Sequence, residues 1–342
     1  MRICQMRSLK EYIPMRISGK LLSLALTVCL IGYAVPAGGQ TKLAQTGFQF
    51  LSVGGDARAS AMAGAFTTVE GYGSATFYNP AGMARLPGAF ELMANQTDWI
   101  ADISHYTFNL AANPFEGRYG VFSISLQNVD YGKVEGTMVW PNSQGYVETE
   151  TINPSAMALG IGYATSLTDR FAVGGQLKQV RQYLGRNVLP EEGVVKNIAS
   201  TFAVDFGTIY RTNFRGFAFG MSVRNFSPEI KYEEEGFQLP LVFKIGASID
   251  AFKFIGRQNS SHSMLVVMDA AHPRAFSEYV SMGAEYSFQN MLHLRFGYTS
   301  GQDEHGLTGG FGLSKFGVKI DYGYTPFGIF GDVHRFTVRL SG

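Results

Sequence analysis

The sequence is short of charge. Only 16% of its 342 residues are charged and the formal net charge is +1, whereas a soluble domain carries about 25% charged residues. Nucleic-acid binding usually needs a basic face, which a chain of this balance does not provide. We therefore expect no nucleic-acid partner, and the low charge favours a protein whose outer surface contacts lipid.

Cysteine is nearly absent as well. The two cysteines, Cys4 and Cys29, both precede the first turn-rich segment of the chain. If the region that holds them is removed, the mature chain has no cysteine, which fits an exported protein that avoids unwanted disulfides.

The N-terminus has the pattern of an export signal. Arg16 and Lys20 precede the apolar run 21-LLSLALTVCLIGYAV-35, and a basic stretch before such a run is typical of a secretory signal peptide. We predict that residues 1–40 are signal peptide and presequence, with cleavage near residues 39–41.

Beyond this region the sequence has no long hydrophobic run. A membrane-spanning helix needs about 18 or more consecutive apolar residues, so a helical span is excluded on length. What recurs instead is alternation of apolar and polar residues, the pattern of a β-strand. The closing segment shows it: Arg335, Phe336, Thr337, Val338, Arg339 and Leu340.

Fourteen segments alternate in this way, and most have the length of about 9 to 11 residues that a tilted membrane strand needs. They lie at 89–98, 103–113, 118–128, 155–165, 170–184, 197–211, 217–226, 240–254, 263–271, 278–288, 291–299, 306–315, 316–325 and 332–341. No helical periodicity separates them, which argues against alternating βαβ units. The sequence therefore predicts an all-β fold, a transmembrane antiparallel β-barrel of about 14 strands over residues 89–342.

The connections between these segments alternate in length. Longer ones, such as 129–154 and 227–239, follow odd-numbered strands, whereas 113–117 and 289–290 follow even-numbered ones. Outer-membrane barrels have short periplasmic turns and longer external loops. We expect a location in the outer membrane of a Gram-negative bacterium with both termini periplasmic, although the turn 255–262 is longer than this rule predicts.

A soluble β-sandwich would alternate too, but with Lys and Glu crowding its outer faces. Here the polar face is mostly Gly, Ser, Thr and Asn with sparse charges of both signs. Sparse charges suit an enclosed lumen in which they pair across strands. We expect one such lumen ion pair between Glu285 and Arg295.

The segment before the first strand, residues 41–88, is too apolar for a solvated tail. We predict that it forms a plug in the lumen, with a short helix over 58–68, and fills space that a barrel of this width otherwise leaves to water. Its last part, 71–88, is rich in turn residues and contains the motif Asn79, Pro80, Ala81 and Gly82. We expect this motif to form an elbow, in which Pro80 favours an extended Asn79 and Gly82 takes a conformation closed to most residues.

The plug segment resembles a known family. The stretches 50-FLSVG-54, 57-AR-58, 63-AGAF-66 and 79-NPAG-82 are similar to the N-terminal signature of the PorV/PorQ family, which is related to the FadL long-chain fatty-acid transporters. The resemblance implies a fourteen-stranded barrel with an N-terminal plug. One departure is 70-EGYGSAT-76, where the family usually has an Asp-rich segment.

Other chemistries have weaker support. Gly309, Gly310 and Gly312 lie in an alternating strand, so close packing accounts for them better than a phosphate loop. The stretches 303-DEH-305 and 233-EEE-235 fall in expected loops without metal-ligand spacing. We expect no metal, no cofactor and no catalytic residue. The six histidines and many serines nevertheless keep an outer-membrane hydrolase as an alternative function.

Two other functions follow from the resemblance. It implies a component of type IX secretion that handles exported cargo at the cell surface, with outer-membrane lipid, secretion-system proteins and cargo domains as partners. The alternative is a FadL-like passive transporter of long-chain fatty acids or another hydrophobic small molecule, which needs an apolar pocket. Aromatic plug residues are candidates for apolar ligand contacts: Phe48, Phe50, Phe66, Phe77 and Tyr78.

Overall fold

A computed structural model describes residues 46–342 except 190–192, 233–234, 257–260 and 302–305. The predicted signal region and both cysteines lie outside the described residues. So do two of the three residues of the acidic run 233–235 and the whole of 303–305.

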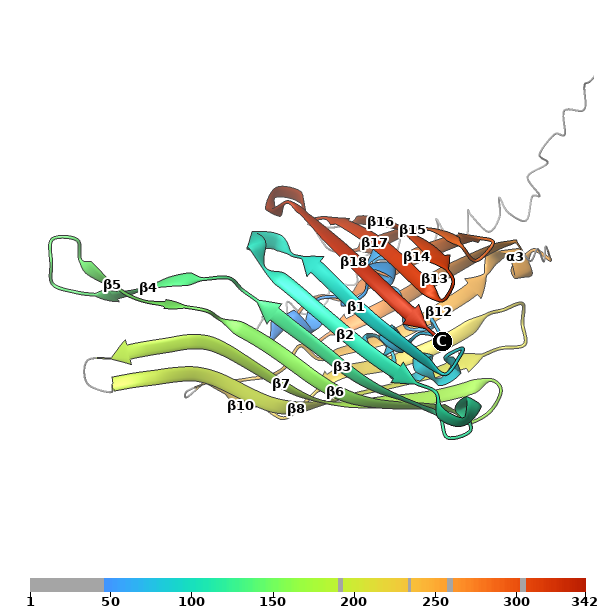
Figure 1. The fold of residues 1–342 in the computed structure, drawn as a ribbon, viewed down its shortest axis with the longest axis horizontal. Helices are drawn as coiled ribbons and strands as arrows, with labels where there is room; N and C mark the ends of the chain where they lie inside the picture. Colours follow the sequence, from blue (N-terminus) through green and yellow to red (C-terminus); the bar gives the residue numbers. More distant parts are fainter. Residues whose placement is uncertain (1–45, 190–192, 233–234, 257–260, 302–305) are drawn as a thin grey trace, which may run out of the picture. The chain divides into compact units, whose positions relative to one another are not determined.

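Fourteen antiparallel strands close into one barrel (Figure 1). They are β1 (Phe90–Asp98), β2 (Ser104–Ala112), β3 (Val121–Asp130), β6 (Ser155–Ser166), β7 (Phe171–Leu189), β8 (Gly193–Arg211), β9 (Ala218–Phe226), β12 (Val242–Asp250), β13 (His262–Pro273), β14 (Tyr279–Phe288), β15 (Leu292–Ser300), β16 (Leu307–Lys315), β17 (Val318–Pro326) and β18 (Asp332–Ser341). The first strand pairs with the last, with Leu92 opposite Leu340. The predicted fold class and strand number are therefore confirmed.

Each strand has one buried and one exposed face. Phe296 on β15 is 68% exposed and Phe108 on β2 is 44% exposed, whereas Thr107 and Thr299, on the opposite faces of the same strands, are buried. In a closed barrel no strand has a free edge. A free edge in hydrocarbon would have backbone N–H and C=O groups without hydrogen-bond partners. An outward apolar face on a closed barrel is the arrangement of a membrane span and not of a sandwich.

The two ends of the barrel differ in their connections. We call the end where Phe90 and Ser341 lie the turn end, and the end where Asp98 and Asp332 lie the loop end. Among the described turn-end connections the longest is that between β12 and β13, and it contains the helix α3 (Ala251–Phe254). Asp250 caps this helix by accepting from the N–H groups of Phe252 and Lys253, so a local helix accounts for the length that the sequence rule did not predict.

Two hairpins at the loop end were not predicted. They are β4 (Val134–Val139) with β5 (Tyr146–Ile152), and β10 (Ile230–Lys231) with β11 (Gly236–Phe237). In addition, β7 and β8 are each 19 residues long, longer than the span a membrane requires. Figure 1 shows the β4–β5 hairpin and the ends of β7 and β8 extending beyond the neighbouring strands.

The segment before β1 runs inside the barrel from the loop end to the turn end. It contains η1 (Gln49–Ser52), α2 (Ala57–Ala61), η2 (Gly73–Phe77) and η3 (Pro80–Arg85); the remaining short helices are η4 (Ile100–Asp102), η5 (Pro114–Gly117) and η6 (Gly328–Phe330). At its start Thr46 bridges to Gln238 in the β9–β12 loop, and at its end Ala89 donates to the Gly342 carbonyl. Within the described residues no helix is long and apolar enough to cross a membrane.

The described chain therefore begins and ends at opposite ends of the barrel. Thr46 lies at the loop end and Gly342 at the turn end. The expectation that both termini lie on one side stays a prediction, because the N-terminus is outside the described residues.

Candidate functional site

Plug and barrel meet along a belt of lumen-facing glycines. We call the segment 49–86 the plug. On nine of the fourteen strands a glycine faces it so closely that an added Cβ would lie within 3.3 Å of a plug atom: Gly162, Gly174, Gly207, Gly220, Gly246, Gly283, Gly297, Gly310 and Gly323. At Gly323, for instance, the Cβ would lie 2.7 Å from the Ala57 carbonyl oxygen. At these nine positions the barrel wall has no room for a side chain of its own, so the wall is shaped to the plug.

A buried network of six charges joins the plug to four strands. Arg58 of α2 holds Glu285 of β14 with two hydrogen bonds of 2.7 Å. Glu285 also accepts from Arg295 at 2.5 Å, and Arg295 donates to Asp321 at 2.6 Å. Arg339 pairs with Asp321 and with Asp56, which closes the network back onto the plug.

The network balances three arginines with three carboxylates, all of them buried. Buried charges are tolerated when they are paired and hydrogen-bonded, and breaking one pair leaves its partner uncompensated. The arrangement therefore fixes the orientation of α2 in the lumen. The predicted pair Glu285–Arg295 forms two of its six members.

Asp56 has a second function as the N-cap of α2. Its carboxylate accepts from the Arg58 N–H at 2.8 Å and from the Ser74 hydroxyl at 2.6 Å, which satisfies a helix N–H that otherwise has no partner. Burial opposes ionisation, but the Arg339 charge and hydrogen bond outweigh it and lower the pKa of Asp56. The helix ends at Ala61, earlier than predicted, because Ala63 and Gly64 take positive φ values of 55° and 69°.

The motif residues 79–82 lie at the start of η3, where the plug touches β6, β7 and β8. Asn79 is extended, with φ −146° and ψ 104°, and its side chain accepts from the Ala81 N–H at 3.1 Å. Its amide donates to the carbonyls of Thr67 at 2.6 Å and Thr208 at 3.2 Å. One side chain thus joins two parts of the plug to the barrel.

Gly82 differs from the expectation. Its φ is not positive, so the prediction of a conformation closed to other residues is wrong. The glycine is needed for space, because a Cβ would lie 2.5 Å from the Val69 carbonyl oxygen and 2.8 Å from the Ala75 Cβ. The Gly82 carbonyl in turn accepts from the Gly71 N–H at 2.8 Å, which closes the elbow.

A further ion-pair cluster holds the plug at the turn end. Glu70 accepts from Arg85 within the plug and from Arg211 at the end of β8, and Arg85 also donates to the Asp169 carbonyl at 2.9 Å. These contacts join the end of the plug to the β6–β7 turn.

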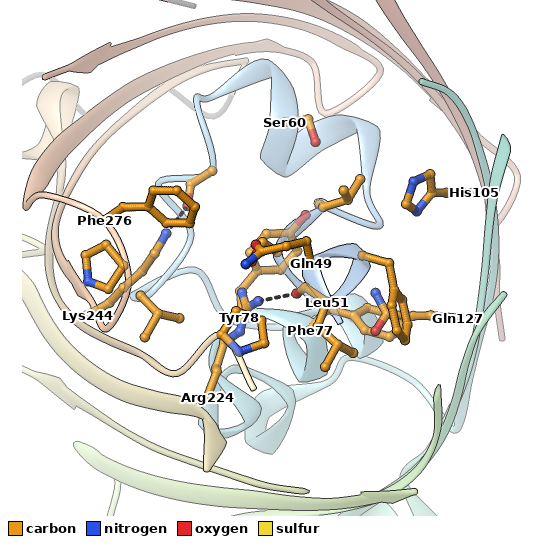
Figure 2. A pocket seen from close by; sticks show the side chains of 18 of the residues that line it. Gln49, Leu51, Ser60, Phe77, Tyr78, His105, Gln127, Arg224, Lys244 and Phe276 are labelled. Atoms are coloured by element: carbon orange, nitrogen blue, oxygen red, sulfur yellow. Dashed lines mark hydrogen bonds between the residues drawn. The ribbon is translucent and has the colours of Figure 1, made fainter. Parts of the chain in front are cut away.

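Above the plug, at the loop end, lies a cavity of about 790 Å³. Plug residues, including Leu51, Phe77 and Tyr78, line it together with inward side chains of the strands and residues of the loop-end connections (Figure 2). The volume is in the range of small-molecule sites. The lining combines apolar and aromatic side chains with many polar and charged ones.

Three of the five predicted apolar contacts line this cavity: Phe50, Phe77 and Tyr78. Phe48 packs instead against Phe50 and against Phe237 of the β9–β12 loop, and Phe66 is buried under Tyr78.

The polar residues of the cavity were not predicted as a site. Five described lining residues are cationic, Lys178, Arg224, Lys244, Arg274 and Arg335, and one is a carboxylate, Asp205. The only signal for them in the sequence was their place on the polar face of alternating strands, which does not say which strands meet. Among the described residues no group of three or more His, Cys, Asp or Glu is placed to hold a metal ion.

Solved structures share this architecture. The Pseudomonas putida toluene transporter TodX matches with a TM-score of 0.57 and 11% identity, over 88% of this chain and 98% of that one. The Ralstonia pickettii toluene transporter TbuX gives 0.53 and 13%, over 83% and 96%. A Pseudomonas aeruginosa FadL homologue gives 0.52 and 12%, over 89% and 100%. Comparison with curated protein sequences finds no match.

Fold and site together define a class, that of closed fourteen-stranded barrels whose lumen holds an N-terminal plug, and the FadL homologue and the toluene transporters are similar to this chain in fold. Residues 37–267 match the family model described as type IX secretion system protein PorV. The protein belongs to the PorV family and is an outer-membrane protein of a Gram-negative bacterium. The family is one of outer-membrane barrels.

Proposed function

We propose that this barrel receives exported cargo of the type IX secretion system at the loop end, which faces the cell exterior, and that the turn end with Gly342 faces the periplasm. The family match over residues 37–267 supports the secretion role. The orientation is supported by the short turns at one end and the long β7–β8 and β4–β5 hairpins at the other, because outer-membrane barrels place their longer loops outside.

The observation that carries the proposal is the fit of the plug to the wall. The glycine belt and the network of Asp56, Arg58 and their strand partners hold the plug against most of the strands. A barrel filled in this way acts through its outer surface, its loop-end cavity and its hairpins. Cargo domains and secretion-system proteins are then partners that contact the loop end.

The lining of the cavity favours a second candidate, a passive transporter of hydrophobic molecules. The solved structures of similar fold include toluene transporters, and Phe50, Phe77 and Tyr78 supply an apolar floor. For transport the plug would have to leave the glycine belt, which its paired charges oppose.

Deletion of the gene in its own host separates the two. For a secretion component, mass spectrometry of the cell surface and medium should show loss of many exported proteins and their accumulation in the periplasm, reversed by the wild-type gene. Unchanged exported proteins combined with lost uptake of a hydrophobic compound would contradict the secretion role and support the transporter.

A further inference from the structure

The turns at the turn end carry exposed apolar side chains. The β2–β3, β6–β7, β8–β9, β14–β15 and β16–β17 turns each present at least one large apolar residue: Phe115, Leu167, Phe214, Met291 and Phe316. Tight turns in contact with water are usually built from Gly, Asn, Asp, Ser and Pro. Apolar side chains that gather at one end of the barrel indicate an interaction surface.

Phe316 shows that this exposure has a cost. It forms the β16–β17 turn together with Gly317, and both residues have positive φ values, of 53° and 78°. A bulky residue rarely takes this conformation, and two-residue turns of this kind favour Asn followed by Gly. The Phe316 side chain is 91% exposed, so contacts within the molecule do not offset the strain. The ring is placed for a contact outside the chain.

The β8–β9 turn combines aromatic rings with a charge. Arg215 lies 5.6 Å from the ring centres of both Phe214 and Phe254 of α3. It also donates to the Phe254 carbonyl at 2.9 Å, which joins two neighbouring turns and holds the exposed guanidinium over the rings. Among the described residues no carboxylate forms an ion pair with Arg215, so its charge is available to an anion from outside.

Two further turns repeat this pairing. Arg118 lies 5.7 Å from the centre of the Tyr119 ring in the β2–β3 turn, and Lys315 lies 4.9 Å from that of Phe316. Several strands separate each of the three pairs from the next in the closed barrel. Three sides of the turn end therefore each present an aromatic ring with a cation over it, an attractive arrangement in itself.

The outward face of the strands is apolar up to the turn end but not up to the loop end. On β18 it changes from Leu340 at the turn end to Asp332 at the loop end. On β1, which pairs with β18, it changes from Phe90 to Asp98. Because the apolar face continues to the last strand residues at the turn end, the turns that follow border the head-group layer of the membrane.

We propose that the turn end binds the head groups of anionic phospholipids. Arg118, Arg215 and Lys315 lie at the lipid phosphates, and the rings beneath them contact the start of the acyl chains. Basic side chains near a membrane surface attract anionic lipid, and aromatic rings prefer the interface between hydrocarbon and water. Arginine also presents paired N–H groups to a phosphate. This surface lies at the end opposite the cavity and does not depend on the secretion role, which the gene deletion tests.

Two residues of equal exposure measure the depth of the turn end. Phe316 is 91% exposed, and Ile329 in the β17–β18 loop at the loop end is 90% exposed. The full chain with Cys4→Ser and Cys29→Ser has no other cysteine, so Phe316→Cys or Ile329→Cys takes up a single NBD fluorophore. The labelled protein is reconstituted in vesicles of equal parts phosphatidylglycerol and phosphatidylcholine. We expect lipid that is spin-labelled at its head group to quench the label at position 316, and aqueous iodide to quench the label at position 329.

Native mass spectrometry measures the lipid preference. The wild type, released from the same vesicles, should retain more phosphatidylglycerol than phosphatidylcholine. The variant with Arg118→Gln, Arg215→Gln and Lys315→Gln should lose this preference by about fivefold or more, as expected when basic groups at a membrane surface are removed. The matched control removes three exposed cations from the loop end and should retain lipid as the wild type does; it carries Lys133→Gln, Arg186→Gln and Lys196→Gln.

Strong iodide quenching at position 316, equal to that at position 329, would overturn the proposal, because the exposed turns would then lie in water. Equal loss of the lipid preference in both triple variants would overturn it too, since total charge would then account for the preference. If the turn-end variant loses the heat-modifiable migration of a folded barrel, Lys315→Gln alone changes one exposed side chain and must still lower the preference. An unchanged preference in that variant contradicts the proposal.

Discussion

At the scale of single residues, Asn79 links the elbow of the plug to the wall. Its side chain bonds to the Ala81 N–H and to the carbonyls of Thr67 and Thr208, all at a fully buried position. Removing a buried partner costs about 1–3 kcal/mol for each group left unsatisfied. The motif thus works through geometry, with Pro80 starting η3 and Asn79 supplying its cap.

Asn79→Ala should loosen the plug without preventing assembly of the barrel. We expect faster protease cleavage within residues 46–70 and a rise in ion conductance across a planar bilayer. Asn142→Ala is the control, because Asn142 makes its hydrogen bonds in the exposed β4–β5 turn. Wild-type protection and conductance in Asn79→Ala, with lost binding of cargo or ligand, would show that the motif is a binding site and not an elbow.

Asp56 makes plug retention sensitive to acid. Its pKa in the folded protein is below its ordinary value of 3.8, so its contribution to stability is fully present above pH 3.8 and is lost as the pH falls through the lowered pKa. We expect pepsin to cleave within residues 46–70 only below pH 3.8. Asp56→Asn should remove this contribution at every pH. If the two proteins release the plug with the same pH profile, Asp56 does not retain it.

At the scale of elements, η3 packs closely against β7 because the lumen-facing side of this strand carries a glycine at the contact. A Cβ at Gly174 would lie 2.5 Å from the Pro80 carbonyl carbon and 2.6 Å from the Ala81 nitrogen, whereas a Cβ at Gly175 meets only the Asp205 carbonyl oxygen, at 3.5 Å. The two neighbours point to opposite sides of the wall.

Gly174→Val should therefore displace the elbow, and Gly175→Val should not. The expected result for Gly174→Val is a barrel that still shows heat-modifiable migration on gels but exposes residues 46–70 to protease. The same protection in both variants would mean that the plug does not pack against β7 as described.

The strand faces give a second prediction at this scale. Arg at Phe296, which lies in the middle of β15 and points outward, should cost about 2–4 kcal/mol when the midplane of the bilayer surrounds it. Thr299→Arg on the same strand points into the cavity and should cost less. Denaturant unfolding in lipid vesicles measures both, and equal losses would indicate a sheet buried on both sides.

Not every inward threonine is equivalent in this respect. Thr107 faces the lumen like Thr299, but a Cβ at Gly55 of the plug would lie 2.8 Å from its side chain. An arginine at Thr107 would have to displace the plug, so it is unsuitable as a tolerant control.

At the scale of the whole molecule, the alternation of residues was enough to predict fourteen strands, closure and an outward apolar face. Each of those properties depends on local spacing. The β4–β5 hairpin escaped prediction because its residues are exposed on both faces, and exposed strands have no alternating pattern to detect.

The site was harder to predict because its partners are far apart in sequence. Arg58 and Glu285 are 227 residues apart and meet only when the plug enters the closed barrel. Arg224 and Arg335 likewise line one cavity only because strands β9 and β18 face the same lumen. The spacing of residues along the chain predicted the pair Glu285–Arg295, because these two residues lie on adjacent strands. The same spacing carries no information about contacts made across the barrel.

The central claim is that cargo meets this barrel at the loop end while the plug stays in place. Photocrosslinking in the native host tests it, with p-benzoylphenylalanine placed at Phe276 beside the cavity or at Phe115, which is 75% exposed in the β2–β3 turn. The account predicts covalent adducts with exported proteins from position 276 and none from position 115. Adducts from position 115 alone, or equally from both positions, would contradict it.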